Sequence, residues 1–354
     1  MLDDPTTFSL VDVREAAEFD EWAIPHAVNI PLTELADRTA ELPVRPIVVV
    51  CASGDRATRG CELLAEAGFD ARILAGGMSA WADVYDDVAL EIAGATVVQL
   101  RRRGKGCLSY VIGAGGAAVV IDPPLAIEHP LAIARARGWK IVGVIDTHLH
   151  ADHLSGARLL AESTAARHYL DAEDPYRFEA TSVADGDRIM LGDLAALDIE
   201  LLETPGHTSG SITVSLAGVA LFTGDCLFVE SVGRPDLAER AEEFAHALYS
   251  SLTQRIFPKG NDVLILPAHY GPGVDLRTGQ LLGASLGELR SSIPALSLDE
   301  DDFVAWAAGQ ATPRPPNYAR IVDINRGAVS LEPGAAVELE AGPNRCAVAA
   351  PPTS

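Results

Sequence analysis

A short loop that begins at Cys51 is the first place where residue types and spacing favour chemistry. The loop 51–56 reads Cys-Ala-Ser-Gly-Asp-Arg and follows the β-branched run 47–50. Backbone N–H groups, the start of the following helix and the charge of Arg56 would stabilise a thiolate there. Such settings lower a cysteine pKa from about 8.5 by one to several units. We therefore predict that Cys51 is a nucleophile able to hold a sulfane sulfur as a persulfide. The simpler alternative is a buried core cysteine.

Seven metal-ligating side chains form a second group. Four stand within six residues, after an apolar run and before a helix expected to start near residue 153, and the other three follow far along the chain. They are His148, His150, Asp152, His153, His207, Asp225 and His269. A lone histidine is usually structural, but imidazoles and carboxylates repeated in this pattern predict a metal site.

Composition narrows the function classes. The chain has 354 residues, 48% of them hydrophobic, which is enough for two or three domains with sizeable cores. Its formal net charge of -23 disfavours binding to nucleic acid and to anionic membranes. No apolar run approaches the ~18 residues of a membrane span, and the start lacks a secretory pattern. We therefore expect a cytoplasmic protein.

Five cysteines without a Cys-x-x-Cys pair argue against a disulfide scaffold. Cys61, Cys107 and Cys346 are most simply core or surface thiols. Cys226 follows a proposed metal ligand, and we interpret it as a small buried residue.

The elements that must position these groups alternate between strand and helix. Over 1–88 we expect a small α/β domain, with strands at 10–13, 47–50 and 71–74 and helices at 32–42 and 57–67. A linker over 86–94 would lead to a second α/β domain over 95–295. Its expected strands are 96–100, 108–112, 117–121, 141–145, 199–202, 212–216, 219–222 and 263–266, with a helix at 126–137. Residues 296–354 would form a helix (300–308), a Pro-rich stretch and a tail.

Four stretches follow the order seen in rhodanese domains. They are 11–15 (Val-Asp-Val-Arg-Glu), 24–31 (Ile-Pro-His-Ala-Val-Asn-Ile-Pro), 51–56 and 74–81 (Leu-Ala-Gly-Gly-Met-Ser-Ala-Trp). This resemblance implies sulfurtransferase activity, with Cys51 and Arg56 as catalytic residues and the loop as a persulfide cradle. Ala52 departs from the Arg that the family often has, and the family's first strand and helix are expected to be cut short.

The pattern His-x-His-x-Asp-His, with the later ligands, resembles the metallo-β-lactamase superfamily over roughly residues 95–295. The resemblance implies an αβ/βα sandwich. In the hydrolase members it implies two zinc or iron ions that lower the pKa of a bound water. One ion would bind His148, His150 and His207. The other would bind Asp152, His153 and His269, and Asp225 would bridge them.

The alternative is a single Fe(II) per chain, held by His148, His207 and Asp225. Two imidazoles and one carboxylate leave coordination positions open, which suits an oxygen-activating iron. The remaining ligand-type residues would then orient water and the ligands. They are His150, Asp152, His153 and His269.

Two further segments resemble the persulfide dioxygenase branch of that superfamily. One is 225–237 (Asp-Cys-Leu-Phe-Val-Glu-Ser-Val-Gly-Arg-Pro-Asp-Leu), and the other runs from 315 to 327. The resemblance implies that Arg234 lies near the active site; a structural ion pair with Asp236 is equally compatible with the sequence. Tyr270 is a second candidate for substrate contact. It lacks the preceding Asp typical of glutathione-using members, so a glutathione pocket does not carry over.

The sequence thus favours a persulfide dioxygenase fused to a rhodanese. Its small-molecule partners would be a persulfide, O2, and sulfite or thiosulfate. A thioester hydrolase of the glyoxalase II type is the main alternative, and a sulfur-relay or sensor protein is a third. The oligomeric state stays open, with a homodimer among the forms to test.

Overall fold

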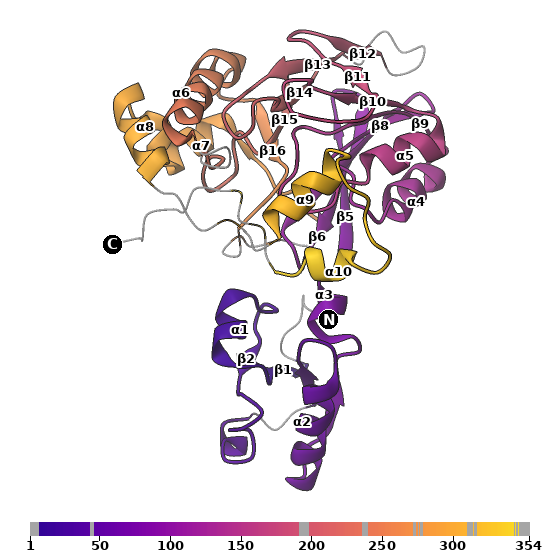
Figure 1. The fold of residues 1–354 in the computed structure, drawn as a ribbon, viewed down its shortest axis with the longest axis vertical. Coiled ribbons are helices and arrows are strands. Elements are labelled where there is room, and N and C mark those ends of the chain that lie inside the picture. Colours follow the sequence, from indigo (N-terminus) through magenta and orange to yellow (C-terminus); the bar gives the residue numbers. More distant parts are fainter. Residues whose placement is uncertain are drawn as a thin grey trace. The chain divides into compact units, whose positions relative to one another are not determined.

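The structure is a computed structural model. It describes residues 7–42, 46–190, 198–235, 240–271, 274, 276, 279–309, 314, 317–342, 344 and 346. The chain divides into two compact units (Figure 1). The first comprises Met1–Tyr85, Arg102–Lys105 and Ala341–Pro343, and the second comprises Asp86–Arg101, Gly106–Glu340 and Asn344–Ser354.

The first unit contains a parallel sheet with strand order β2-β1-β3-β4. Its strands are β1 (Ser9–Asp12), β2 (Val28–Asn29), β3 (Ile47–Val50) and β4 (Ala71–Ile73). Its helices are α1 (Ala16–Glu21), η1 (Thr39–Glu41), α2 (Asp55–Glu66) and α3 (Gly77–Trp81). The β-branched run of β3 is almost wholly buried, as expected of a central parallel strand.

The prediction of a helix over residues 32–42 is wrong. The segment forms consecutive turns and then the short 3-10 helix η1. Only Leu35 and Leu42 of this segment are fully buried. A stripe of two residues is too narrow to hold an amphipathic helix against the sheet, and short helices are marginal without such packing.

Two mixed sheets form the second unit. The seven-stranded sheet has the order β11-β10-β9-β8-β7-β6-β5, and the six-stranded sheet has the order β12-β13-β14-β15-β16-β17. Strands of the first sheet are β5 (Tyr85–Ile92), β6 (Ala95–Arg102), β7 (Cys107–Ala114), β8 (Ala117–Ile121), β9 (Lys140–Ile145), β10 (Arg167–Leu170) and β11 (Thr181–Ser182). Strands of the second are β12 (Arg188–Met190), β13 (Asp198–Glu203), β14 (Ile212–Leu216), β15 (Ala220–Gly224), β16 (Leu264–Pro267) and β17 (Ala284–Ser285).

The second unit also contains helices. They are α4 (Glu128–Ala136), α5 (Ala157–Thr164), α6 (Ala241–Ser251), η2 (Leu252–Ile256), η3 (Phe257–Lys259), α7 (Leu286–Ser292), η4 (Pro294–Ser297), α8 (Glu300–Gly309), α9 (Tyr318–Asn325) and α10 (Ala336–Leu339). Helices α4 and α5 lie beside β8–β10, and α6, α7 and α8 gather beside β14–β16 (Figure 1). One apolar core joins the facing sheets, and a second joins the six-stranded sheet to α6–α8. The predicted αβ/βα sandwich is therefore confirmed.

The segment 86–94 is not the linker that we expected. It is largely strand β5, at the edge of the seven-stranded sheet, where Val88 and Ile92 are buried. Ala93 and Gly94 then turn the chain into β6 with φ angles of 51° and 83°. The acidic start of the strand, Asp86-Asp87, hid its alternating pattern.

Candidate functional sites

The Cys51 thiol is buried at the point where β3 ends. Its Sγ accepts hydrogen bonds from the backbone N–H groups of Gly54, at 3.1 Å, and Ala57, at 3.3 Å. Helix α2 begins at Asp55, so one of these donors belongs to its first turn. The N–H hydrogens place partial positive charge beside the sulfur, an environment that favours a negatively charged persulfide there.

Backbone contacts from a second segment close this loop. The N–H of Met78 donates to the carbonyl of Cys51 at 2.9 Å, and Ser79 donates to that of Ala52 at 3.2 Å. Gly77, with φ of 56°, lies so close that an added Cβ would stand 2.3 Å from the Cys51 oxygen. The Gly-Gly pair is therefore needed for α3 to approach the loop.

Arg56 donates hydrogen bonds from its guanidinium to Glu18 on α1. Two nitrogens donate to the two carboxylate oxygens at 2.6 and 2.8 Å. These bonds lower the pKa of Glu18 to about 2. Arg56 thus contributes charge near the loop while its hydrogen bonds tie α2 to α1.

A cluster of three buried side chains in the second unit gathers from three separate segments. One ligand atom each of His148, His207 and Asp225 lies within 4.8 Å of the others. His148 follows β9, His207 follows β13, and Asp225 follows β15, so strand ends of both sheets supply the cluster.

The free atoms of this cluster fit a metal ion. His148 Nε2, His207 Nε2 and Asp225 Oδ2 are buried and have no hydrogen-bond partner among the described residues. Buried polar atoms are normally paired, and two imidazoles with a carboxylate are a common set for a divalent transition metal. The chain therefore contains a metal-binding His/Asp cluster.

The second nitrogen of each of these imidazoles is held by a neighbouring group. Thr147 Oγ1 lies 2.9 Å from His148 Nδ1, and the backbone oxygen of Arg234 lies 3.0 Å from His207 Nδ1. Thr147 is fixed in turn by Asp122, which accepts from its backbone N–H at 2.7 Å and from its hydroxyl at 2.8 Å. Such outer contacts fix the ring orientation that metal binding needs.

Asp122 also orients His150. Its Oδ1 lies 3.1 Å from His150 Nε2, while His150 Nδ1 is buried and has no hydrogen-bond partner in the described part of the chain. Burial lowers the pKa of His207 to about 4, so its imidazole is neutral at pH 7 and able to bind a metal. Burial would raise the pKa of Asp225, but His269 and His148 outweigh it and lower that pKa well below its usual range.

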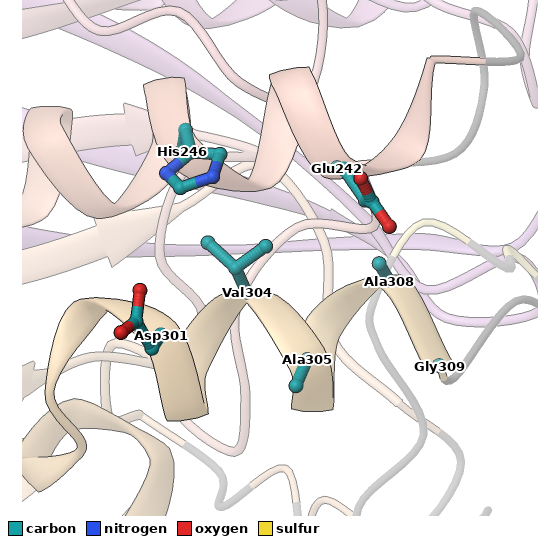
Figure 2. Close-up of a pocket in the computed structure, with 7 residues that line it drawn as sticks. All are labelled: Glu242, His246, Asp301, Val304, Ala305, Ala308 and Gly309. Carbon is teal, nitrogen blue, oxygen red and sulfur yellow. The ribbon is translucent and has the colours of Figure 1, made fainter.

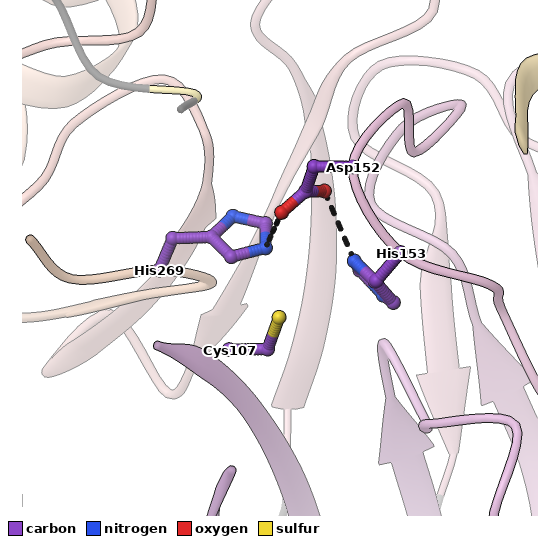
Figure 3. A group of neighbouring side chains, drawn as sticks. All are labelled: Cys107, Asp152, His153 and His269. Atoms are coloured by element: carbon purple, nitrogen blue, oxygen red, sulfur yellow. Dashed lines mark hydrogen bonds and ion pairs between the residues drawn. The ribbon is translucent and has the colours of Figure 1, made fainter. Parts of the chain in front are cut away.

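A second cluster adjoins the first and contains a thiol. One ligand atom each of Cys107, Asp152, His153 and His269 lies within 4.8 Å of the others, and Figure 3 shows these side chains converging. Asp152 contacts both imidazoles, with Oδ2 at 3.2 Å from His269 Nε2 and Oδ1 at 3.1 Å from His153 Nδ1. His269 Nδ1 lies 2.6 Å from Asp225 Oδ1 and so links the two clusters.

Two cysteines beside the metal centre were not identified from the sequence. We interpreted Cys107 and Cys346 as core or surface thiols; both are buried, but each lies among ligand-type residues. Cys346 groups with Asp225 and His269 within 4.8 Å. Its carbonyl accepts from the Arg234 N–H at 2.9 Å. Neither cysteine lies in a recognisable motif, and only its place in the fold brings it to the site.

The two expected substrate-contacting residues are both buried. Arg234 is 3% exposed and Tyr270 is 7% exposed. Tyr270 belongs to the apolar core between the sheets. Asp236, the alternative ion-pair partner of Arg234, lies outside the described residues, as do residues 315 and 316 of the second diagnostic segment.

A cavity of about 430 Å³ lies between α6 and α8, apart from the predicted ligands (Figure 2). It is lined by Glu242, His246, Asp301, Val304, Ala305, Ala308 and Gly309. None of the seven predicted ligands lines it, so this cavity gives no support to the metal chemistry. No helix among the described residues is long and apolar enough to cross a membrane.

Two domain families match the chain. Residues 1–83 match the rhodanese-like domain, and residues 102–269 match the metallo-beta-lactamase superfamily. The first covers the loop that holds Cys51, and the second covers all seven predicted ligands.

Two similar proteins differ in their activity. The chain is 30% identical over 210 residues to the mitochondrial persulfide dioxygenase ETHE1 of Homo sapiens, covering 59% of this chain and 78% of that protein. It is 40% identical over 124 residues to a hydroxyacylglutathione hydrolase of Rhodospirillum rubrum, but covers only 47% of that protein and 34% of this chain. The dioxygenase similarity spans more of both chains.

Two solved structures resemble the fold of about 70% of this chain. The crystal structure of ETHE1 from Myxococcus xanthus has a TM-score of 0.57 at 28% identity, and the match covers 69% of this chain and 99% of that one. A metallo-beta-lactamase from Staphylococcus aureus has a TM-score of 0.59 at 26% identity, covering 71% of this chain and 74% of that chain.

Proposed function

Because the chain belongs to the persulfide dioxygenase branch of the metallo-β-lactamase superfamily and carries a rhodanese-like domain, we propose that it oxidises a low-molecular-weight thiol persulfide with O2. One O2 and one water would convert R–S–SH into R–SH and sulfite, with release of two protons. The observation that supports this most directly is the buried cluster of His148, His207 and Asp225, whose three unpartnered atoms face one another.

A single Fe(II) per chain is the metal that we propose for this cluster. Three protein ligands leave positions open, and bound iron would supply the activation of O2 beside the substrate sulfur. Neighbouring residues of the protein would orient the three ligand side chains. The Thr147 hydroxyl and the Arg234 carbonyl hold the two imidazoles, and His269 holds one oxygen of Asp225, which leaves the other oxygen for the metal.

We propose that the Cys51 domain moves sulfane sulfur to or from the small molecules of the same reaction. The Cys51 thiolate would take the outer sulfur of thiosulfate and release sulfite, or pass its persulfide sulfur to sulfite and form thiosulfate. No external oxidant is needed because sulfane sulfur moves without a net change in electrons. The two N–H donors on Sγ support the thiolate and persulfide forms alike.

Oxygen consumption by the iron-loaded protein tests the main proposal. We expect O2 uptake with glutathione persulfide or another small persulfide, with about one sulfite formed per O2. Absence of uptake with every persulfide tried, together with hydrolysis of an acyl-thiol, would refute it.

A thioester hydrolase is the second candidate, because the hydroxyacylglutathione hydrolase of Rhodospirillum rubrum is 40% identical to this chain over 124 residues. Such a site would hold two ions, with Asp225 as the bridge. Metal analysis separates the candidates, since one iron per chain favours the dioxygenase and two metals favour the hydrolase.

A cytoplasmic location and a homodimer stay predictions.

A further inference from the structure

We propose that Asn325, the last residue of α9, is a positioning residue that holds the loop 148–155 in the shape that metal binding needs. We call this segment the ligand loop, because it begins at His148 and carries three further ligand-type side chains. The role rests on the metal-binding cluster and not on the proposed dioxygenase reaction. It gives the C-terminal part of the second unit a function at the metal centre.

The ligand loop depends on other segments for its backbone hydrogen bonds. It forms neither helix nor strand, and every residue in it except Ser155 is buried. Buried backbone N–H and C=O groups are almost always paired, and a loop without regular structure needs side chains or distant backbone to pair with. The shape of this loop is therefore set by the groups that contact it.

The amide of Asn325 supplies three of these contacts. Its Nδ2 donates to the His150 carbonyl at 2.9 Å and to the His153 carbonyl at 2.7 Å. Its Oδ1 accepts from the Ser155 N–H at 3.0 Å. An asparagine amide has two N–H donors and one carbonyl acceptor, which matches two carbonyls and one N–H. One side chain thus fixes the backbone on both sides of Asp152.

The C-terminal part of the second unit holds the loop at a second point, and the end of α9 is itself fixed. Glu340, only 4% exposed, accepts from the Leu154 N–H at 2.7 Å. The carbonyl of Arg326, which follows α9, accepts from the Arg177 N–H at 2.7 Å. Two side chains from this part of the chain therefore converge on the ligand loop, and Asn325 acts from an anchored position.

A shift of the ligand loop would separate the metal ligands. His148 belongs to this loop, whereas His207 and Asp225 come from segments that Asn325 does not contact in the described residues. Their three ligand atoms lie within 4.8 Å of one another only while these segments keep their positions. Contacts to groups outside the ligands commonly change metal affinity by about 10–100-fold. Loss of the Asn325 amide should therefore weaken metal binding.

Competition for Co²⁺ between a chelating dye and the metal-free full-length protein tests this role. Asn325→Asp keeps the shape and an acceptor for the Ser155 N–H but loses both donors, and Asn325→Ala loses all three bonds without adding charge. We expect the tightest-bound Co²⁺ to bind about 10–100-fold more weakly in both variants. The measurement needs neither O2 nor a persulfide, so failure of the proposed dioxygenase reaction would not produce the same result.

Asn29→Asp is the matched control in the first unit. The Nδ2 of Asn29 also donates to two backbone carbonyls, those of Asp12 at 3.0 Å and Arg14 at 2.9 Å, but none of the three residues carries a metal ligand. This variant loses the same kind of bonds and should bind Co²⁺ as tightly as the wild-type protein.

Amide hydrogen exchange of the metal-free proteins shows whether the change is local. Exchange over 147–156 should be faster in Asn325→Ala, while exchange over the first unit stays at the wild-type rate. If Asn325→Ala does not fold, Asn325→Asp, which keeps the side-chain shape, must still show the weaker binding. Wild-type Co²⁺ affinity in a folded Asn325 variant, or an equal loss of affinity in Asn29→Asp, overturns the proposal.

Discussion

The Cys51 loop and the His/Asp metal centre are both buried, and we propose sulfur chemistry for both, but different parts of the chain form them. Around Cys51, backbone N–H groups from one short stretch of chain make the environment of the sulfur. At the metal centre, side chains from strand ends far apart in sequence make it. The first site therefore depends on the local path of the backbone, and the second depends on how two sheets bring distant side chains together.

We therefore expect a different kind of substitution to inactivate each site. Side chains around Cys51 are replaceable as long as the nucleophile and the loop path remain. The metal centre requires each ligand and also the close approach of the segments that carry them. Four substitutions test this contrast.

The largest effect is expected from Cys51→Ser. A hydroxyl cannot replace the thiolate as a sulfur nucleophile, so sulfur transfer from thiosulfate to cyanide should fall to background. Oxygen consumption with a small persulfide should be largely intact. Cys61→Ser, on the same helix-and-strand unit, should leave both activities unchanged. Loss of both activities in Cys51→Ser would mean that the two sites are obligately coupled.

The complementary change is His207→Ala. Loss of an outer contact to a metal ligand commonly costs about 10–100-fold in metal affinity or activity, so loss of the ligand itself should cost at least about 100-fold. Bound metal and oxygen consumption should fall together, while thiosulfate:cyanide transfer persists. His246→Ala, which removes an exposed imidazole paired with Glu300 on α8, is the matched control. Persistence of oxygen consumption in His207→Ala would remove this residue from the proposed centre.

The contrast also explains what could be predicted from sequence. The Cys51 loop is contiguous, so its motif, its strand and its helix could be predicted together. The seven candidate ligands could be predicted because they fall into short motifs at strand ends. The αβ/βα sandwich followed from the resemblance that these motifs carry.

Long-range packing explains what was missed. Cys107 reaches the centre only because the start of β7 pairs with the segment around His269, a contact between residues more than a hundred positions apart. Nothing in the residues around Cys107 signals that pairing. The prediction of a linker over 86–94 was wrong for a related reason. Pairing with β6 makes this segment an edge strand despite its acidic start.

A smaller effect is expected from Gly233→Ala, which tests how closely segments approach at the metal centre. An added Cβ would stand 1.9 Å from the Asp225 carbonyl oxygen and 3.3 Å from His207 Cβ. The chain must shift, and overpacking of this kind costs about 1–3 kcal/mol in unfolding free energy. Metal content should fall as the two ligands separate. Gly309→Ala, where an added Cβ meets nothing within 4 Å, should lower neither metal content nor stability; equal metal content in both variants would contradict the close approach.

The smallest effect is expected from Glu18→Gln, which removes the ion pair that Arg56 makes beside the Cys51 loop. The side chains of Arg56 and Glu18 are 33% and 39% exposed, so solvent screens the pair and its loss should cost no more than about 1 kcal/mol. The pairing lowers the pKa of Glu18 from 4.5 to about 2 in the folded protein. Its stabilisation should therefore be complete above pH 4.5 and lost as the pH falls towards 2. Denaturant unfolding of both proteins across this range measures the difference. A deficit in Glu18→Gln that is as large at pH 2 as at pH 7 would show that packing, rather than charge, links α1 to α2.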